Sequence, residues 1–259
     1  MKRVVPPLVV LALVLGVWLL FSYALLDPDR RFLLPPPQRV VRVGFLDWSN
    51  LREVLVALWA TTRVALTGLA IATALGVALA VAMSQAAWVE RSLYPYAVVL
   101  QTVPILALVP LIGFWFGFNF ASRVIVCVLI AAFPVITNSL FGLKSVDQAH
   151  HDLFTLYGAG RLTRLWKLEL PSALPAVFTG LRISAGLSVI GAIVGEFFFR
   201  QGFVGIGRLL DVYRSTLESE KLFTAIFVSS MLGLSVFWVF GFIAHLVLRR
   251  WYEPARRRR

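Results

Sequence analysis

Long apolar stretches separated by short polar connections dominate this chain. They cover about residues 6–26, 56–84, 94–117, 122–143, 175–198 and 222–248. A helix of roughly 20 apolar residues crosses the hydrocarbon core of a bilayer, and a helix satisfies its own backbone groups there. The pattern predicts an all-α polytopic membrane protein with about six transmembrane helices.

Composition agrees with this prediction. Hydrophobic residues make up 59% of the 259 and charged residues only 15%, with a mean hydropathy of +0.82, unlike a soluble domain. The net charge of +12 does not indicate nucleic-acid binding, because much of it lies at residues 256–259 and at helix ends. Anionic headgroups attract cations at such places, so we expect membrane lipid and no nucleic acid as a partner.

Charge also predicts the orientation. Thirteen lysines and arginines lie on the side of the two termini and of residues 144–174, and nine lie on the other side, where acidic residues nearly cancel them. Lys- and Arg-rich loops stay in the cytoplasm. Both termini and the 144–174 loop are therefore expected inside.

The N-terminal apolar run is too long for a cleaved signal peptide, whose core has about 7 to 15 residues. We favour a retained first span, and its cleavage would leave five. Asp27-Pro28 and the three prolines at 35–37 predict an extended external connection after it. The predicted organisation is an accessory first helix and linker at 1–50, followed by a core of five transmembrane helices at 51–259.

The polar 144–174 loop carries helix signals of its own. Ser145 and Gln148 have the spacing of a capping box, and Gly158 is suited to the left-handed residue that ends a helix. A second short helix is expected to stop near Pro171.

An apolar stripe runs along the first of these loop helices. Ala149, Leu153, Leu156 and Tyr157 fall at i, i+4, i+7 and i+8, the spacing of one helix face. No soluble domain in this chain is available to cover that face. The stripe predicts a docking surface for a partner protein.

The loop resembles the EAA loop of bacterial ABC import permeases, in which Glu-Ala-Ala is followed by a glycine and a Leu-Pro pair at fixed spacing. Four positions match: Gly158, Leu168, Leu170 and Pro171. The name-giving triplet differs, since Asp152, Leu153 and Phe154 replace Glu-Ala-Ala. The resemblance implies that these seven residues form the loop that couples the permease to its ATPase.

Other segments extend the resemblance. Gln101-Thr-Val-Pro104, Leu106-Ala-Leu-Val-Pro110 and Trp115-Phe-Gly117 are similar to the third helix of nitrate, sulfonate and taurine permeases, and Gly180-Leu-Arg182 to the start of their fifth. The stretch 191–202 resembles the branch that transports thiamine-precursor pyrimidines and riboflavin.

The resemblance implies a type I ABC importer permease fold in the bacterial cell membrane. It implies cytoplasmic ABC ATPase subunits, a second copy of the permease in a homodimer, and an extracytoplasmic solute-binding protein as partners. Alternating access would carry a small organic or oxyanion solute into the cytoplasm. ATP and Mg would be bound by the partner ATPase, with no cofactor in this chain.

Catalytic and metal motifs are missing from the sequence. Gly142-Leu-Lys-Ser145 lacks the upstream glycine of a phosphate-binding loop. His150 and His151 are adjacent and point about 100° apart on a helix, so they cannot hold one metal ion. Cys127 is the only cysteine and has no neighbouring base. We expect neither an enzyme nor a metal site.

Ionisable residues inside predicted spans are functional candidates. We expect Arg63 and Glu196 to lie along the translocation path or to pair across the bundle, and favour structural pairing over substrate contact. Arg123 and Arg182 lie near helix ends, where snorkelling to the interface explains them.

Prolines and glycines predict local geometry. Pro104 and Pro110 predict a kinked third span facing protein. The glycine pairs at 113 and 117 and at 191 and 195 permit close helix packing, and we favour contacts within one subunit over contacts between subunits.

An ion-coupled secondary transporter is the alternative function. Inverted repeats and a network of buried carboxylates would favour it, but Glu196 alone is clearly central in a span. A membrane enzyme is a weaker alternative, because catalytic groups are missing.

Overall fold

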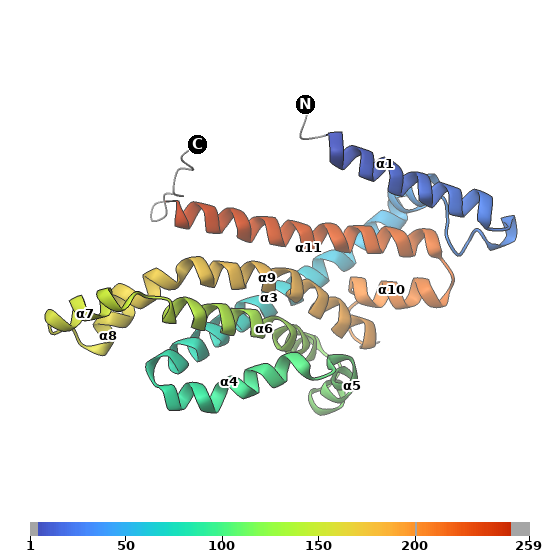
Figure 1. Cartoon of the computed structure of the whole chain (residues 1–259). Helices are drawn as coiled ribbons and strands as arrows, with labels where there is room; N and C mark the ends of the chain where they lie inside the picture. The colour runs from blue at the N-terminus through green and yellow to red at the C-terminus, as the bar shows by residue number, and fades with distance from the viewer. Residues whose placement is uncertain (1–4, 200, 250–259) are drawn as a thin grey trace.

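The computed structural model describes residues 5–199 and 201–249, and every regular element in that part of the chain is helical (Figure 1). The predicted all-α class is confirmed. The α-helices are α1 (Val5–Leu20), α2 (Pro37–Val40), α3 (Trp48–Gln85), α4 (Ala87–Thr102), α5 (Ile105–Phe116), α6 (Phe120–Lys144), α7 (Gln148–Leu156), α8 (Arg161–Arg164), α9 (Leu170–Phe198), α10 (Ile206–Ser215) and α11 (Ser219–Leu248).

Among the described residues, five helical segments are long and apolar enough to cross a membrane: Val5–Leu25, Trp48–Gln85, Phe120–Lys144, Arg161–Phe198 and Ser219–Leu248. The pair α4 and α5 also qualifies as one span, bent by 99° at its break. In Figure 1, α3 and α6 run in the same direction, and α4 leads back from the end of α3 toward the start of α6. With this bent pair counted as one span, the described residues contain six candidate spans.

The break in this span lies at Val103 and Pro104. Val103 is extended, with φ −64° and ψ 131°, as the residue before a proline prefers. Pro104 then caps α5, whereas Pro110 lies inside α5 without ending it. The predicted kink is confirmed, and the span begins at Ala87, seven residues earlier than predicted.

Small residues let α3, α6 and α9 pack closely. A Cβ on Gly68 of α3 would overlap the side chain of Cys127 on α6, and a Cβ on Gly191 of α9 would lie 2.8 Å from the Cα of Cys127. Gly195 faces the Cα of Arg123, also on α6. The 191/195 glycine pair thus makes its close contact within the subunit.

Helix α1 lies at the periphery and has no buried residue. Trp18 anchors it, because Nε1 donates to the carbonyl of Pro35 at 3.0 Å and its ring lies 5.2 Å from that of Phe223. The division at residue 50 stays a prediction.

The linker after α1 is not extended as predicted. It forms a 3₁₀ turn at Pro28–Arg30, helix α2, and a π-helical segment at Val41–Leu46. Pro37 is the first residue of α2, a position where the missing proline N–H is harmless.

Two predictions within the 144–174 loop are wrong. Asp147, not Ser145, caps α7 by accepting the N–H of Ala149 at 3.1 Å, while the Ser145 hydroxyl donates to the carbonyl of Gly142 in the last turn of α6. Pro171 also ends no helix, since helical structure continues from Arg161 to Phe198. The π-helical segment Leu165–Glu169 precedes Pro171 and relaxes the normal hydrogen-bond pattern there.

Candidate functional site

The turn after α7 is built around Gly158, whose φ is +65°. Its N–H donates to the carbonyl of Thr155, and the N–H of Ala159 donates to that of Phe154, both at 2.9 Å. A Cβ on Gly158 would meet nothing within 4 Å. Glycine is therefore favoured here by backbone conformation rather than by lack of space, as predicted.

Helices α7 and α8 and the following π-helical turn expose five large apolar side chains, which we call the α7–α8 apolar surface: Leu153, Leu156, Tyr157, Leu162 and Trp166. Leu156 is 86% exposed and Tyr157 83%. These elements form one end of the molecule in Figure 1. The predicted stripe is exposed, but Leu162 and Trp166 were missed, although their i, i+4 spacing in a basic segment was a usable signal.

The α7–α8 unit is braced internally. The guanidinium of Arg164 donates to the hydroxyl of Thr155 at 3.0 Å and to the carbonyl of Ala159 at 3.2 Å. On α7, Gln148 donates to Asp152 at 3.0 Å. Asp152 and Leu153 are exposed, and Phe154 is half-buried.

The remaining loop residues attach this unit to the bundle. Leu168 is buried, and Leu170 and Pro171 are half-buried. Glu169 accepts a hydrogen bond from Gln85, at the end of α3, at 3.3 Å. The predicted seven-residue set therefore divides into an exposed part and an anchoring part.

Glu196 of α9 is fully buried where α3, α9 and α10 meet. Its Oε2 accepts from the Thr61 hydroxyl at 2.7 Å and from the backbone N–H of Gly207 at 3.1 Å. A Cβ on Gly205 would overlap this carboxyl group. Thr61 is not among the residues predicted from the sequence. Because Gly205 and Gly207 have no side chains, there is room for Glu196.

Arg63 lies apart from Glu196. Its side chain is exposed in the described chain, and its guanidinium lies 5.8 Å from the ring centroid of Phe120. No ion pair joins Arg63 to Glu196, both of which the structure describes. The expected pairing is wrong: Arg63 lies at an exposed position beside Phe120, whereas Oε2 of Glu196 accepts from Thr61 and Gly207 in a buried junction. A place along the translocation path stays a prediction for both residues.

Arg123 does not snorkel, contrary to prediction. It is fully buried and donates to the carbonyls of Phe199, Gln201 and Phe203 at 3.4, 2.7 and 3.0 Å. Its guanidinium also lies 3.9 Å from the ring centroid of Phe203. Arg123 thus fixes the segment that follows α9.

Arg182 remains exposed, and its guanidinium lies 4.1 Å from the ring centroid of Phe237 on α11. Its surroundings differ from those of the buried Arg123, whose guanidinium donates to three backbone carbonyls. A position at the membrane interface remains the expectation for Arg182.

Helix α10 is also tied to the start of α3. The hydroxyl of Tyr213 donates to Oε2 of Glu53 at 2.9 Å. Burial, followed by this hydrogen bond, raises the pKa of Tyr213 above its usual value. Tyr213 is therefore a neutral donor over the physiological pH range.

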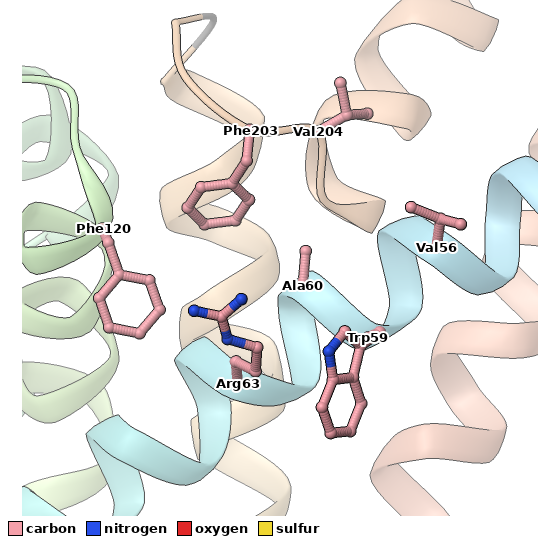
Figure 2. Close-up of a pocket in the computed structure, with 7 residues that line it drawn as sticks. All are labelled: Val56, Trp59, Ala60, Arg63, Phe120, Phe203 and Val204. Atoms are coloured by element: carbon pink, nitrogen blue, oxygen red, sulfur yellow. The ribbon is translucent and has the colours of Figure 1, made fainter.

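A cavity of about 510 Å³ opens between α3, α6 and the segment after α9 (Figure 2). Its lining is Val56, Trp59, Ala60, Arg63, Phe120, Phe203 and Val204. Figure 2 shows the guanidinium of Arg63 extending from α3 toward the rings of Phe120 and Phe203. In the part of the chain that the structure describes, no group of three or more His, Cys, Asp or Glu side chains is arranged to hold a metal ion.

Residues 72–256 match the family described as "Binding-protein-dependent transport system inner membrane component". The chain is 35% identical over 227 residues to the formylaminopyrimidine transport permease protein ThiX of Halalkalibacterium halodurans, covering 88% of this chain and 87% of the relative. It is 30% identical to the taurine transport system permease protein TauC of Escherichia coli, covering 92% and 84%.

The riboflavin transport system permease protein RibX of Chloroflexus aurantiacus is 32% identical, over 62% of this chain and 60% of the relative. A solved structure described as "Crystal structure of an amino acid ABC transporter with histidines" superposes with a TM-score of 0.61 at 18% identity, over 80% of this chain and 98% of that chain. This structural likeness supports the fold.

Proposed function

This chain belongs to the family of inner membrane components of binding-protein-dependent transport systems, and we propose that two copies of it form the path of an importer for a small organic or oxyanion solute. As an ABC importer permease it is not itself catalytic. It works with a cytoplasmic ATPase and an extracytoplasmic binding protein.

The α7–α8 apolar surface carries the proposal that this chain couples directly to the ATPase. Leu156 and Tyr157 are almost completely exposed on a helix outside the candidate spans. Such an apolar patch indicates a protein contact. The hydrogen bonds from Arg164 hold α7 and α8 together, and the hydrogen bond between Glu169 and Gln85 ties the loop to the end of α3. Through these contacts a displacement of α7 by the ATPase can be transmitted to α3.

The names of the relatives point to two chemical classes of cargo, ring compounds and small anions. ThiX and RibX are named for formylaminopyrimidine and riboflavin, and TauC for taurine. We propose that this chain moves a solute of one of these classes by alternating access, with ATP binding and hydrolysis switching the two states.

Co-purification tests the coupling. Leu156→Asp places a charge on the α7–α8 apolar surface and should abolish ATPase co-purification while the permease still inserts. Leu46→Asp is the matched control, because Leu46 is also largely exposed, at 75%, but lies before α3. It should retain the ATPase.

The wild-type complex should hydrolyse ATP, and its binding protein should stimulate that activity. A wild-type permease that purifies without an ATPase and transports in response to an ion gradient would contradict the proposal and support a secondary transporter. Retention of the ATPase by Leu156→Asp would remove the α7–α8 apolar surface from the docking site.

A further inference from the structure

We propose that the cavity between α3, α6 and the segment after α9 binds a planar ring with hydrogen-bond acceptors at its edge. The ring packs on the aromatic walls, and Arg63 donates to the acceptors. This inference rests on the proposed function, because it chooses the ring class of cargo over the small-anion class.

Arg63 supplies the first argument. It belongs to the membrane-spanning segment Trp48–Gln85, and no carboxylate among the described residues pairs with it. A cation in a span is costly unless it has a partner or faces a polar path. Its guanidinium carries five N–H donors and no acceptor, so a ligand with acceptors would satisfy it.

The aromatic wall supplies the second argument. The rings of Phe120 and Phe203 lie 6.1 Å apart between centroids, and both line the cavity. Arg123 holds Phe203 through the carbonyl hydrogen bond and the contact with its ring. Because the Phe203 side chain is already held in place, it loses little conformational entropy when a flat ring packs on it.

Size and polarity supply the third argument. About 510 Å³ lies within the range of cavities that hold small organic molecules. Arg63 is the one charged side chain in the lining, and the other six lining residues are apolar or aromatic. A nitrate or a small sulfonate could pair with Arg63, but it is too small to cover the aromatic and apolar walls of a cavity of about 510 Å³. The face of a planar ring can pack on the aromatic and apolar lining residues, and acceptors at its edge can bind Arg63.

Direct binding tests the inference on the permease–ATPase complex in lipid nanodiscs without binding protein. Riboflavin, followed by its fluorescence, is the ring probe, and radiolabelled taurine is the small-anion probe. Trp59→Leu, Phe203→Leu and Arg63→Gln should each weaken riboflavin binding at least tenfold. Val56→Trp, which fills the cavity from an exposed position, should block it.

Trp238→Leu is the matched control, since Trp238 is an exposed aromatic residue on α11 outside the cavity lining. It should bind riboflavin like the wild type. Failure of the wild type to bind riboflavin, equal binding of taurine, or riboflavin binding that is insensitive to all four cavity variants would overturn the inference. ATPase stimulation by the binding protein, measured on the same samples, reports separately on the importer function.

Discussion

The hydroxyl of Thr61 on α3 donates to Oε2 of Glu196 on α9 at 2.7 Å, and its oxygen accepts the backbone N–H of Ile206, the first residue of α10, at 2.9 Å. One side chain thus joins two membrane-spanning helices to a helix outside the candidate spans. All three groups are buried, so each depends on the others for hydrogen bonding.

Thr61→Val should therefore destabilise the protein by about 1–3 kcal/mol, because it leaves the Glu196 carboxylate and the Ile206 N–H without their shared partner. Thr61→Ser keeps the hydroxyl and is the matched control. Thermal unfolding of the purified variants in detergent measures the difference. Equal melting temperatures for the Val and Ser variants would show that the hydroxyl contributes nothing.

Glu196→Gln should insert at the wild-type level and support nearly normal uptake. The amide oxygen of Gln can accept from both Thr61 and Gly207, and the Glu196 side chain has no exposed surface from which to contact a solute within this subunit. Glu196→Ala should lower the amount of folded protein, because both donors lose their acceptor. A strong loss of uptake in Glu196→Gln at unchanged protein level would instead place this carboxylate in the transport mechanism.

The spans could be predicted from the long apolar stretches of the sequence, since the length and composition of a helix determine whether it can cross a bilayer. The exact residues at which helices begin, end or break could not be predicted where two nearby residues are equally suited to the position. Ser145 and Asp147 are both good capping residues, and the pattern could not show that Ser145 completes α6 while Asp147 begins α7. Pro104 and Pro110 likewise look equivalent in the sequence, yet the break occurs at Pro104.

Contacts between distant segments could not be predicted from the sequence. Arg123 looked like an interfacial residue because it lies near the start of a span, but carbonyls 76 to 80 residues later in the chain fold over it. Glu196 was recognised as unusual, but Thr61, its partner 135 residues away, was not. The sequence indicates which residues are exceptional, and tertiary packing decides what they contact.

Arg123→Lys should lower stability by at least about 1.5 kcal/mol, the scale of one lost hydrogen bond to a charged group. A lysine ammonium cannot reproduce the planar fork that spans the carbonyls of Phe199, Gln201 and Phe203. Arg182→Lys is the control, because Arg182 is exposed and contacts a ring rather than three carbonyls. Chemical denaturation or melting in detergent should separate the two variants, and similar small losses in both would contradict a fixing role for Arg123.

Gly158→Val should abolish uptake while the protein still inserts. At φ +65° a β-branched residue is strained by about 1–2 kcal/mol or more, and the backbone relaxes by turning α7 away from its position. Gly160→Val is the matched control, because Gly160 lies in the same turn, has equally open surroundings, and has an ordinary φ of −69°. Gly158→Asn should retain much of the activity, since asparagine tolerates the left-handed region. Binding-protein-stimulated ATPase activity of the purified complexes measures the effect, and normal stimulation in Gly158→Val would show that the orientation of α7 is not what couples the ATPase to the permease.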